Sequence, residues 1–288
     1  MEGTLRRLLP NMFREKPRDA YNTQPDQRQL FGWYQYLKNQ GSQLPRFSDA
    51  GYRVYSQVDE DGILIYIFSL IGFSNKLLVD AAFGAPQGAN TTNLICNWGF
   101  SGLLIEGDKK KCDHARAFFS AHPDTLIMPP VTEHDWVTAE NINAILDRND
   151  IRGEIDLFSL DIDGNEYHVW KALTIVSPRV IIVEARTFWG SGRSVTIPYN
   201  PGFNRFDIHP DFYGASIAAL VKLGHEKGYR LVACNRFGYN IFFVRNDIGK
   251  ESLPEISIDE CFSFTSPELK QKREAILKEV AGYKWIEV

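Results

Sequence analysis

The sequence has few cysteines, no long apolar run and little net charge. Its 4 cysteines are scattered without Cys-x-x-Cys spacing, which indicates neither a zinc knuckle nor a disulfide framework. No stretch approaches the roughly 20 apolar residues that a membrane-spanning helix needs. The net charge of −4 and the pI near 5.9 argue against a surface dedicated to nucleic acid.

The first residues also lack the features of an exported protein. Charges and prolines interrupt residues 1–19 and leave no apolar run long enough for a signal peptide. We therefore expect a soluble, cytoplasmic protein with no membrane span and no nucleic-acid partner. The sequence indicates no oligomeric state.

What the sequence does contain is an alternation of short apolar runs and helix-like segments. The intervening segments include amphipathic stretches at 138–149 and 165–173. Strands that alternate with helices imply right-handed crossovers and one parallel sheet. The runs have the length expected of buried parallel strands and lie at 77–82, 102–107, 125–130, 155–161 and 179–185.

The last two apolar runs follow a different pattern. Runs 229–235 and 239–246 are separated by only a short Arg-Phe-Gly stretch, which predicts a β-hairpin. Dinucleotide dehydrogenases usually continue with parallel strands, whereas methyltransferases that use S-adenosylmethionine end with a reversed seventh strand. The hairpin therefore favours the second class of fold.

The chain divides into three predicted parts. Residues 1–50 form a polar N-terminal extension whose aromatic spacing suits a helix packed on the body. Residues 51–250 hold the sheet, and residues 251–288 form a C-terminal extension with a charged helix at 267–281. Residues 186–213 form an insertion rich in aromatics, Gly and Pro. Loops of this length in a compact domain are often functional lids.

Residues 77–108 carry the strongest functional signal. An apolar run ends in Asp80, a turn containing Gly84 and Gly88 follows, and after a helix-compatible stretch a second run ends in Glu106. This layout is typical of a nucleotide site, in which backbone approaches the ligand and the second acid accepts from two ribose hydroxyls. A turn with two glycines also joins strands to helices for structural reasons alone, so both interpretations stay open.

Further motifs along residues 55–246 are more specific when taken together. They are Ser56-Gln57, Asp61-Gly62, Asp80, Gly84, Asn90 to Leu94, Gly99 to Asp108, Leu160 to Tyr167, Pro178-Arg179, Glu184, Tyr213 to Ser216 and Gly228 to Leu231. On these motifs the chain resembles the FkbM-type S-adenosylmethionine-dependent methyltransferases. The resemblance implies a Rossmann-like class I methyltransferase, an α/β fold with a doubly wound, mostly parallel seven-stranded sheet and an antiparallel last strand.

One motif departs from the family pattern. The family turn typically reads acid-x-Gly-x-Gly-x-Gly, and here Ala82 and Pro86 replace two of the three glycines. Ala82 adds a methyl group where backbone would approach the ligand, and Pro86 removes an N–H. Either the turn adjusts around a bound cofactor, or the affinity for the cofactor is weak or lost.

The resemblance implies that S-adenosylmethionine lies across the carboxyl ends of the first three strands. Glu106 would accept from the ribose diol, Asp80 would anchor the ammonium group and Trp136 would stack on the adenine. Asp135 could accept from the adenine amino group, or it could cap the helix that follows. The residues assigned to the cofactor in this way are Gln57, Asp80, Ala82, Gly84, Asn90, Glu106, Gly107, Asp135, Trp136 and Asp161.

The candidate catalytic residues follow the fourth strand. Because side chains alternate along extended backbone, Asp161 and Asp163 lie on the same side and could take a proton from a substrate hydroxyl. Together with Glu184 they could instead hold Mg²⁺ through oxygen ligands, or the Asp-x-Asp-Gly turn could merely cap a helix. His209, in the insertion, is an alternative base.

The sequence therefore predicts methyl transfer to an oxygen, less readily a nitrogen, of a small molecule. The acceptor class, a saccharide, glycolipid headgroup or similar natural product, comes from the resemblance alone. Two alternatives stay open, a nucleotide-sugar or NAD-linked Rossmann enzyme and a non-catalytic binding protein that kept the fold. The aromatic residues of the insertion suit stacking on a sugar or could hold the insertion in place; they are Phe188, Trp189, Tyr199, Phe203 and Phe206.

Overall fold

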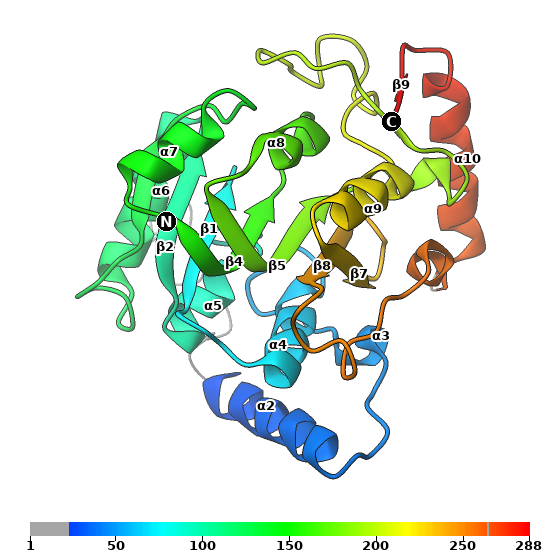
Figure 1. Cartoon of the computed structure of the whole chain (residues 1–288). Coiled ribbons are helices and arrows are strands. Elements are labelled where there is room, and N and C mark those ends of the chain that lie inside the picture. Colours follow the sequence, from blue (N-terminus) through cyan, green and yellow to red (C-terminus); the bar gives the residue numbers. More distant parts are fainter. Residues whose placement is uncertain (1–22, 264) are drawn as a thin grey trace, which may run out of the picture.

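The computed structural model describes residues 23–263 and 265–288 (Figure 1). The first 22 residues of the predicted N-terminal extension lie outside the described residues. The helices are α2 (Gln24–Asn39), α3 (Phe47–Ala50), α4 (Glu60–Ile71), α5 (Thr92–Trp98), α6 (Lys109–Ala121), α7 (Ile142–Arg148), α8 (Glu166–Ala172), α9 (Ile217–Glu226) and α10 (Pro267–Val280), with 3₁₀ turns η2 (Thr187–Trp189) and η3 (Ile258–Phe262). The strands are β1 (Leu77–Ala81), β2 (Ser101–Glu106), β3 (Val131–His134), β4 (Gly153–Leu160), β5 (Val176–Glu184), β6 (Val195–Thr196), β7 (Tyr229–Cys234), β8 (Asn240–Arg245) and β9 (Ile286–Glu287).

A seven-stranded sheet in the order β3-β2-β1-β4-β5-β8-β7 forms the centre of the molecule. Strand β8 runs antiparallel to both β5 and β7, and the pairs among β1 to β5 are parallel. The predicted fold class, with its reversed last strand and closing hairpin, is therefore confirmed. Strands β6 and β9 form a separate two-stranded sheet.

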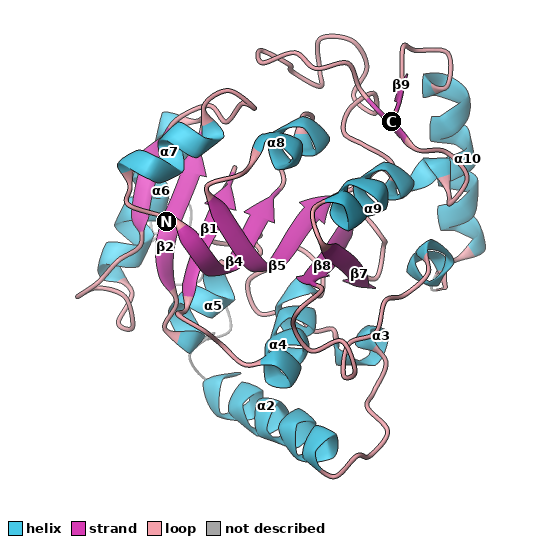
Figure 2. Ribbon diagram, viewed as in Figure 1, coloured by secondary structure: helices cyan, strands magenta, loops and turns pink. Residues whose placement is uncertain are grey.

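Helices cover both faces of the large sheet (Figure 2). Apolar side chains of α7, α8 and α9 pack on one face, and those of α4, α5 and α6 pack on the other. Because both faces are covered, the central strands read as nearly continuous apolar runs. Helix α2 packs outside α4 (Figure 1). Among the described helices, none combines the length and the apolar character that crossing a membrane requires.

The prediction of a strand at 125–130 was wrong. The third strand is Val131–His134, which begins opposite Leu103 of β2. Residues 125 and 126 donate their backbone N–H groups to His122 O in a turn, and the apolar side chains of this stretch are exposed, with Ile127 at 87%. Two prolines then follow, which lack the N–H groups that a ladder needs. The true strand is a short, polar edge strand, so hydrophobicity alone did not reveal it.

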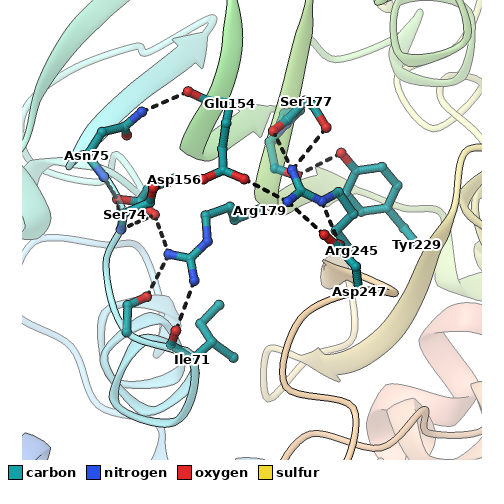
Figure 3. A network of polar contacts seen from close by, with 12 residues as sticks. Ile71, Ser74, Asn75, Glu154, Asp156, Ser177, Arg179, Tyr229, Arg245 and Asp247 are labelled. Carbon is teal, nitrogen blue, oxygen red and sulfur yellow. Dashed lines mark hydrogen bonds and ion pairs between the residues drawn. The ribbon is translucent and has the colours of Figure 1, made fainter.

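A polar network fixes β4 and β5 at their amino-terminal halves (Figure 3). Arg179 of β5 donates to Asp156 of β4 at 2.7 Å and to the carbonyl oxygens of Ile71 and Gly72 at the end of α4. Asp156 also accepts from the backbone N–H groups of residues 74–76, just before β1. The network therefore joins α4, β1, β4 and β5 at the edge of the sheet where the parallel strands begin.

Candidate active site

A cleft of about 610 Å³ lies at the carboxyl ends of β1, β2 and β4. A smaller hollow of about 60 Å³ adjoins it and shares Ala82, Glu106 and Trp136 with it. Gly107 and Asp135 line the hollow, and the other residues assigned to the cofactor line the cleft. The ten positions chosen from the sequence therefore surround one connected space, at the place where parallel α/β sheets bind ligands.

The turn after β1 keeps the left-handed backbone that glycines would supply. Ala82 has φ of 66° and Gly84 has φ of 71°. The left-handed conformation costs a residue with a Cβ about 1 to 2 kcal/mol. The N–H groups of Ala82 and Phe83 both donate to Ile105 O, at 2.9 and 3.1 Å, which holds Ala82 in this conformation. Pro86 is buried and is not among the residues that line the cleft.

Glu106 joins the end of β2 to this turn. Its Oε2 accepts from the N–H of Gly84 at 2.7 Å, and its Oε1 accepts from the N–H of Asp108 at 2.8 Å. The N-cap of α6 is Asp108, which accepts from the N–H of Lys110, so Glu106 does not cap that helix. Each carboxylate oxygen has a second lone pair. Glu106 can therefore still accept hydrogen bonds from two adjacent hydroxyls in the cleft.

Asp80 is a buried acid that forms no ion pair with any residue that the structure describes. Its side chain accepts a hydrogen bond from Thr91 Oγ1 at 2.6 Å. Burial raises the pKa of Asp80 to about 7, the hydrogen bond from Thr91 opposes this shift, and the charge of Glu106 adds to it. A ligand ammonium group in the cleft would stabilise the charged form of Asp80.

Trp136 and Asp135 border the smaller hollow. Trp136 lies against Gly107, where an added Cβ would come within 2.7 Å of the indole ring, and its Nε1 donates to Pro201 O at 2.9 Å. Asp135 accepts from Arg148. The N-cap of α7 is Asn141, so Asp135 does not cap this helix. More than half of the Trp136 side chain is exposed, which leaves part of the ring available for stacking.

The Ser-Gln and Asp-Gly motifs together bring Gln57 to the cleft. Asp61 Oδ2 accepts from the N–H groups of Val54, Tyr55 and Ser56 at 2.6 to 2.8 Å, and Ser56 pairs with Gly88 of the glycine turn. Burial raises the pKa of Asp61 to about 6, against the effect of these hydrogen bonds. The loop 54–58 is thus docked on the turn, with Gln57 facing the cleft.

Four carboxyl groups gather where β4 and β5 end. Carboxylate oxygens of Asp161, Asp163 and Glu184 lie within 4.8 Å of one another. The pKa of Asp161 is raised well above its usual range, first by burial and then by the charge of Glu184. Burial and the same neighbouring charge raise the pKa of Glu166 to about 8.

Glu166 was missed in the sequence, although it is fully buried. Its Oε1 accepts from the N–H groups of Ile162 and Gly164 at 3.1 and 2.8 Å, and its Oε2 has no hydrogen-bond partner within residues 23–263 and 265–288. The sequence feature that could have identified it is an acidic residue in the first turn of the helix that follows the Asp-x-Asp-Gly motif. Glu166 folds that motif back on itself and so positions Asp161.

Two arginines and a tyrosine from the 186–213 insertion complete this cluster. Arg205 pairs with Asp163, and Arg186 Nη1 lies 3.7 Å from Glu184 Oε1. Tyr213 donates to Glu184 Oε1 at 3.2 Å, and both guanidinium groups lie over its ring, at 3.8 and 4.5 Å from the centroid. Sequence reasoning missed Arg205 and Tyr213 because they lie more than 25 residues from the acids that they contact.

The structure places His209 away from the cleft. Its Nε2 lies 3.6 Å from Glu279 Oε2, and its ring centroid lies 5.9 Å from that of Tyr283. His209 could act on a molecule in the cleft only after the insertion rearranged. Phe203, by contrast, lines both the cleft and the hollow, and Phe206 lies at the cleft with 71% of its surface exposed.

Comparisons with known proteins give one sequence match and several structural ones. Residues 75–231 match the family described as the Methyltransferase FkbM domain. No curated protein sequence matches the chain.

The structural matches are remote. The pyocyanin biosynthetic protein PhzM matches with a TM-score of 0.37 and 13% identity over 62% of this chain and 53% of its own. An O-methyltransferase family protein from Burkholderia thailandensis matches with a TM-score of 0.38 and 12% identity over 65% and 58%. The magnesium protoporphyrin IX methyltransferase ChlM from Synechocystis PCC 6803, with bound SAM, gives a TM-score of 0.37 and 11% identity over 85% and 90%. The chain thus spans only a little more than half of the length of the first two proteins.

Proposed function

The chain belongs to the FkbM methyltransferase domain family, and on that premise we propose that it transfers a methyl group from S-adenosylmethionine to a hydroxyl oxygen of a small, sugar-like acceptor. The observation that supports this most is the single cleft that joins the glycine turn, Glu106 and the acids that follow β4. The cofactor residues and the candidate base thus share one space, as transfer between two bound molecules requires.

The cofactor half of the cleft suits S-adenosylmethionine. Glu106 offers two oxygens to the ribose diol, Asp80 offers a buried carboxylate to the ammonium group, and Trp136 offers an exposed ring to the adenine. The cofactor supplies an activated methyl group on a sulfonium sulfur. The protein has to align the acceptor oxygen, exclude water and remove one proton.

We assign removal of the proton to Asp161. It lines the cleft, whereas Glu166 is fully buried and Asp163 is paired with Arg205. A raised pKa makes its carboxylate a stronger base once the group is ionised. Glu184 and Glu166 lie behind it and keep its charged form unfavourable, so the proton is accepted readily.

The acceptor half of the cleft supports a hydroxyl-rich molecule. The amide side chain of Asn204 lines it together with the acids that follow β4, and Phe206 adds an exposed ring. Amides and carboxylates hydrogen-bond hydroxyl groups, and an aromatic ring packs on the apolar face of a sugar. This combination favours a saccharide or a glycolipid headgroup over a purely apolar acceptor.

Mg²⁺ is a second candidate for the acid cluster. Asp161, Asp163 and Glu184 present oxygen ligands within reach of one ion. Two of these three groups are already paired with arginines, which favours the role in proton transfer. If the ion is used, EDTA should abolish methyl transfer and Mg²⁺ should restore it; unchanged rates in EDTA would exclude it.

Calorimetry with S-adenosylhomocysteine tests the proposal directly. We expect binding with a Kd on the order of micromolar, equivalent to about 8 kcal/mol. Binding of NAD instead would support an NAD-linked Rossmann enzyme. If neither ligand binds, the result would support a non-catalytic binding protein. Transfer of a labelled methyl group to members of a saccharide and glycolipid panel would then identify the acceptor. Binding of S-adenosylhomocysteine with labelling of amines but not hydroxyls would overturn the oxygen assignment.

A further inference from the structure

The end of the chain, outside the region matched by the family, packs on the 186–213 insertion. Strand β9 pairs with β6 of the insertion, with Val195 opposite Glu287, and the N–H of Val288 donates to Ser194 O at 3.0 Å. In Figure 1 β9 and α10 lie beside this insertion, at the opposite side of the molecule from α2. We refer to residues 281–288 as the tail.

Trp285 is the centre of the contact between the tail and the insertion. Its ring lies 4.9 Å from that of Phe212, 5.2 Å from that of Trp189 and 6.0 Å from that of Phe188, centroid to centroid. Its Nε1 donates to Val280 O at 2.9 Å, which fixes the ring on the end of α10. These aromatic rings belong to an apolar cluster of their own, separate from the two that cover the faces of the sheet.

This apolar cluster leads directly to the acceptor half of the cleft. Phe203 belongs to it, lines the cleft and packs so closely on Gly164 that a Cβ there would lie 2.5 Å from its ring. Tyr213 also belongs to it and contacts Glu184. Arg205, two residues after Phe203, holds Asp163. Phe212, which contacts Trp285, therefore directly precedes Tyr213, which contacts Glu184.

We propose that Trp285 is a positioning residue for the acceptor, which it affects through Phe212, Tyr213 and the 203–206 stretch. This inference rests on the proposed function, since it concerns the acceptor half of the same cleft. The ribose and methionine part of the cofactor half depends on β1, β2 and the glycine turn, none of which contributes to the cluster around Trp285, and only the hollow beside Trp136 shares Phe203 with that cluster. Loss of the indole should therefore weaken acceptor binding much more than cofactor binding.

The test compares Trp285→Ala with a matched control, Trp33→Ala. Trp33 is an exposed tryptophan on α2, stacked on Tyr36 and remote from the tail. In Trp285→Ala, amide hydrogen exchange of residues 195–213 should rise about tenfold or more, while exchange of residues 77–108 stays unchanged. Trp33→Ala should change neither region.

Kinetic measurements then distinguish a role of Trp285 in positioning the acceptor from a general loss of rigidity in the domain. With the acceptor on which transfer is first measured, Trp285→Ala should raise KM about tenfold, and the S-adenosylhomocysteine Kd should stay within about twofold. Trp285→Phe, which keeps an aromatic ring, should recover most of the wild-type KM. If Trp285→Ala unfolds the chain, Trp285→Leu provides a milder version of the same comparison.

Two outcomes would overturn the inference. One is faster exchange in the tail with unchanged exchange at 195–213, because the insertion would then hold its conformation alone. The other is an equal loss of acceptor and cofactor affinity, which would mean that Trp285 supports the whole domain. Failure of the wild-type protein to bind S-adenosylhomocysteine would count against the proposed function instead, and the exchange measurement would still decide the contact between tail and insertion.

Discussion

The same two strands, β4 and β5, carry charged groups at both of their ends, and the two groups differ in how completely they are satisfied. At the amino-terminal halves, Asp156 and Arg179 form a buried pair whose remaining hydrogen bonds go to backbone groups (Figure 3). At the carboxyl ends, Glu166 and Glu184 each have an oxygen without a partner in the described part of the chain, and the pKa values of Asp161, Glu166 and Glu184 are all raised.

This difference distinguishes charged groups that stabilise the fold from charged groups that suit proton transfer. A buried ion pair with every hydrogen bond made resists change, because removal of either member leaves an uncompensated charge. A crowded group of acids is held in an unfavourable state, which suits a site that must gain and lose protons. The two ends of one pair of strands can therefore be told apart by substitution.

The largest expected effect is at the structural end. Arg179→Met should destabilise folding by about 3 to 5 kcal/mol, because Asp156 would remain buried without its cation. Denaturant unfolding measures the loss. The double variant with Asp156→Asn removes the stranded charge and should recover part of the stability. A loss below about 1 kcal/mol for Arg179→Met would mean that water replaces the arginine, and the contrast between the two ends would fail.

At the chemical end, Asp161→Asn should cut methyl transfer by about a hundredfold or more, the usual contribution of a general base. Stability should stay level or rise, because one charge leaves a repulsive cluster. The S-adenosylhomocysteine Kd should change little. Methyl-transfer rates, calorimetry and unfolding would be measured on the same preparation. Parallel losses of activity, cofactor affinity and stability would show that Asp161 maintains the fold instead.

The pH dependence of stability gives a third contrast. The raised pKa of Glu166, about 8, means that the folded chain holds this proton after the unfolded chain has lost it. Its contribution to stability is therefore fully present below about pH 4 and is lost as the pH rises toward 8, at up to about 1.4 kcal/mol per pH unit. Glu166→Gln imitates the protonated form, so it should match the wild type at about pH 4 and be more stable at pH 8. Equal free energies of unfolding for the two proteins at both pH values would contradict this.

The cofactor half should respond differently from either acid group. Glu106→Ala should weaken S-adenosylhomocysteine binding by about 1 to 3 kcal/mol, since it removes charge-assisted acceptors from the diol. Glu106→Gln, which keeps the shape but not the charge, should lose less. Calorimetry measures both. Wild-type affinity in the alanine variant would show that the ligand lies elsewhere in the cleft.

The smallest expected effect concerns Ala82. Ala82→Gly should stabilise the turn by up to about 1 kcal/mol, because glycine adopts the left-handed conformation without a Cβ penalty. Thermal unfolding would show a small rise in Tm, with unchanged affinity for S-adenosylhomocysteine. A marked gain in affinity would indicate that the methyl group of Ala82 intrudes on the ligand.

Sequence reasoning was successful where local pattern decides structure. The parallel strands other than β3, the hairpin of β7 and β8, and the motifs of the first two strands all follow from apolar runs and turn residues. It failed at β3, whose polar residues pair only because β2 lies beside them. It missed Glu166, Arg205 and Tyr213, because their contacts with the acids are set by the packing of α8 and of the insertion.

The late position of Trp285 in the chain has a consequence for biosynthesis. Because a ribosome delivers residues in order, the seven strands of the large sheet can assemble before α10 and the tail emerge. The cofactor half of the cleft can thus form on a nascent polypeptide, before Trp285 is available to pack on the 186–213 insertion. Completion of the acceptor wall would therefore be the later of the two steps.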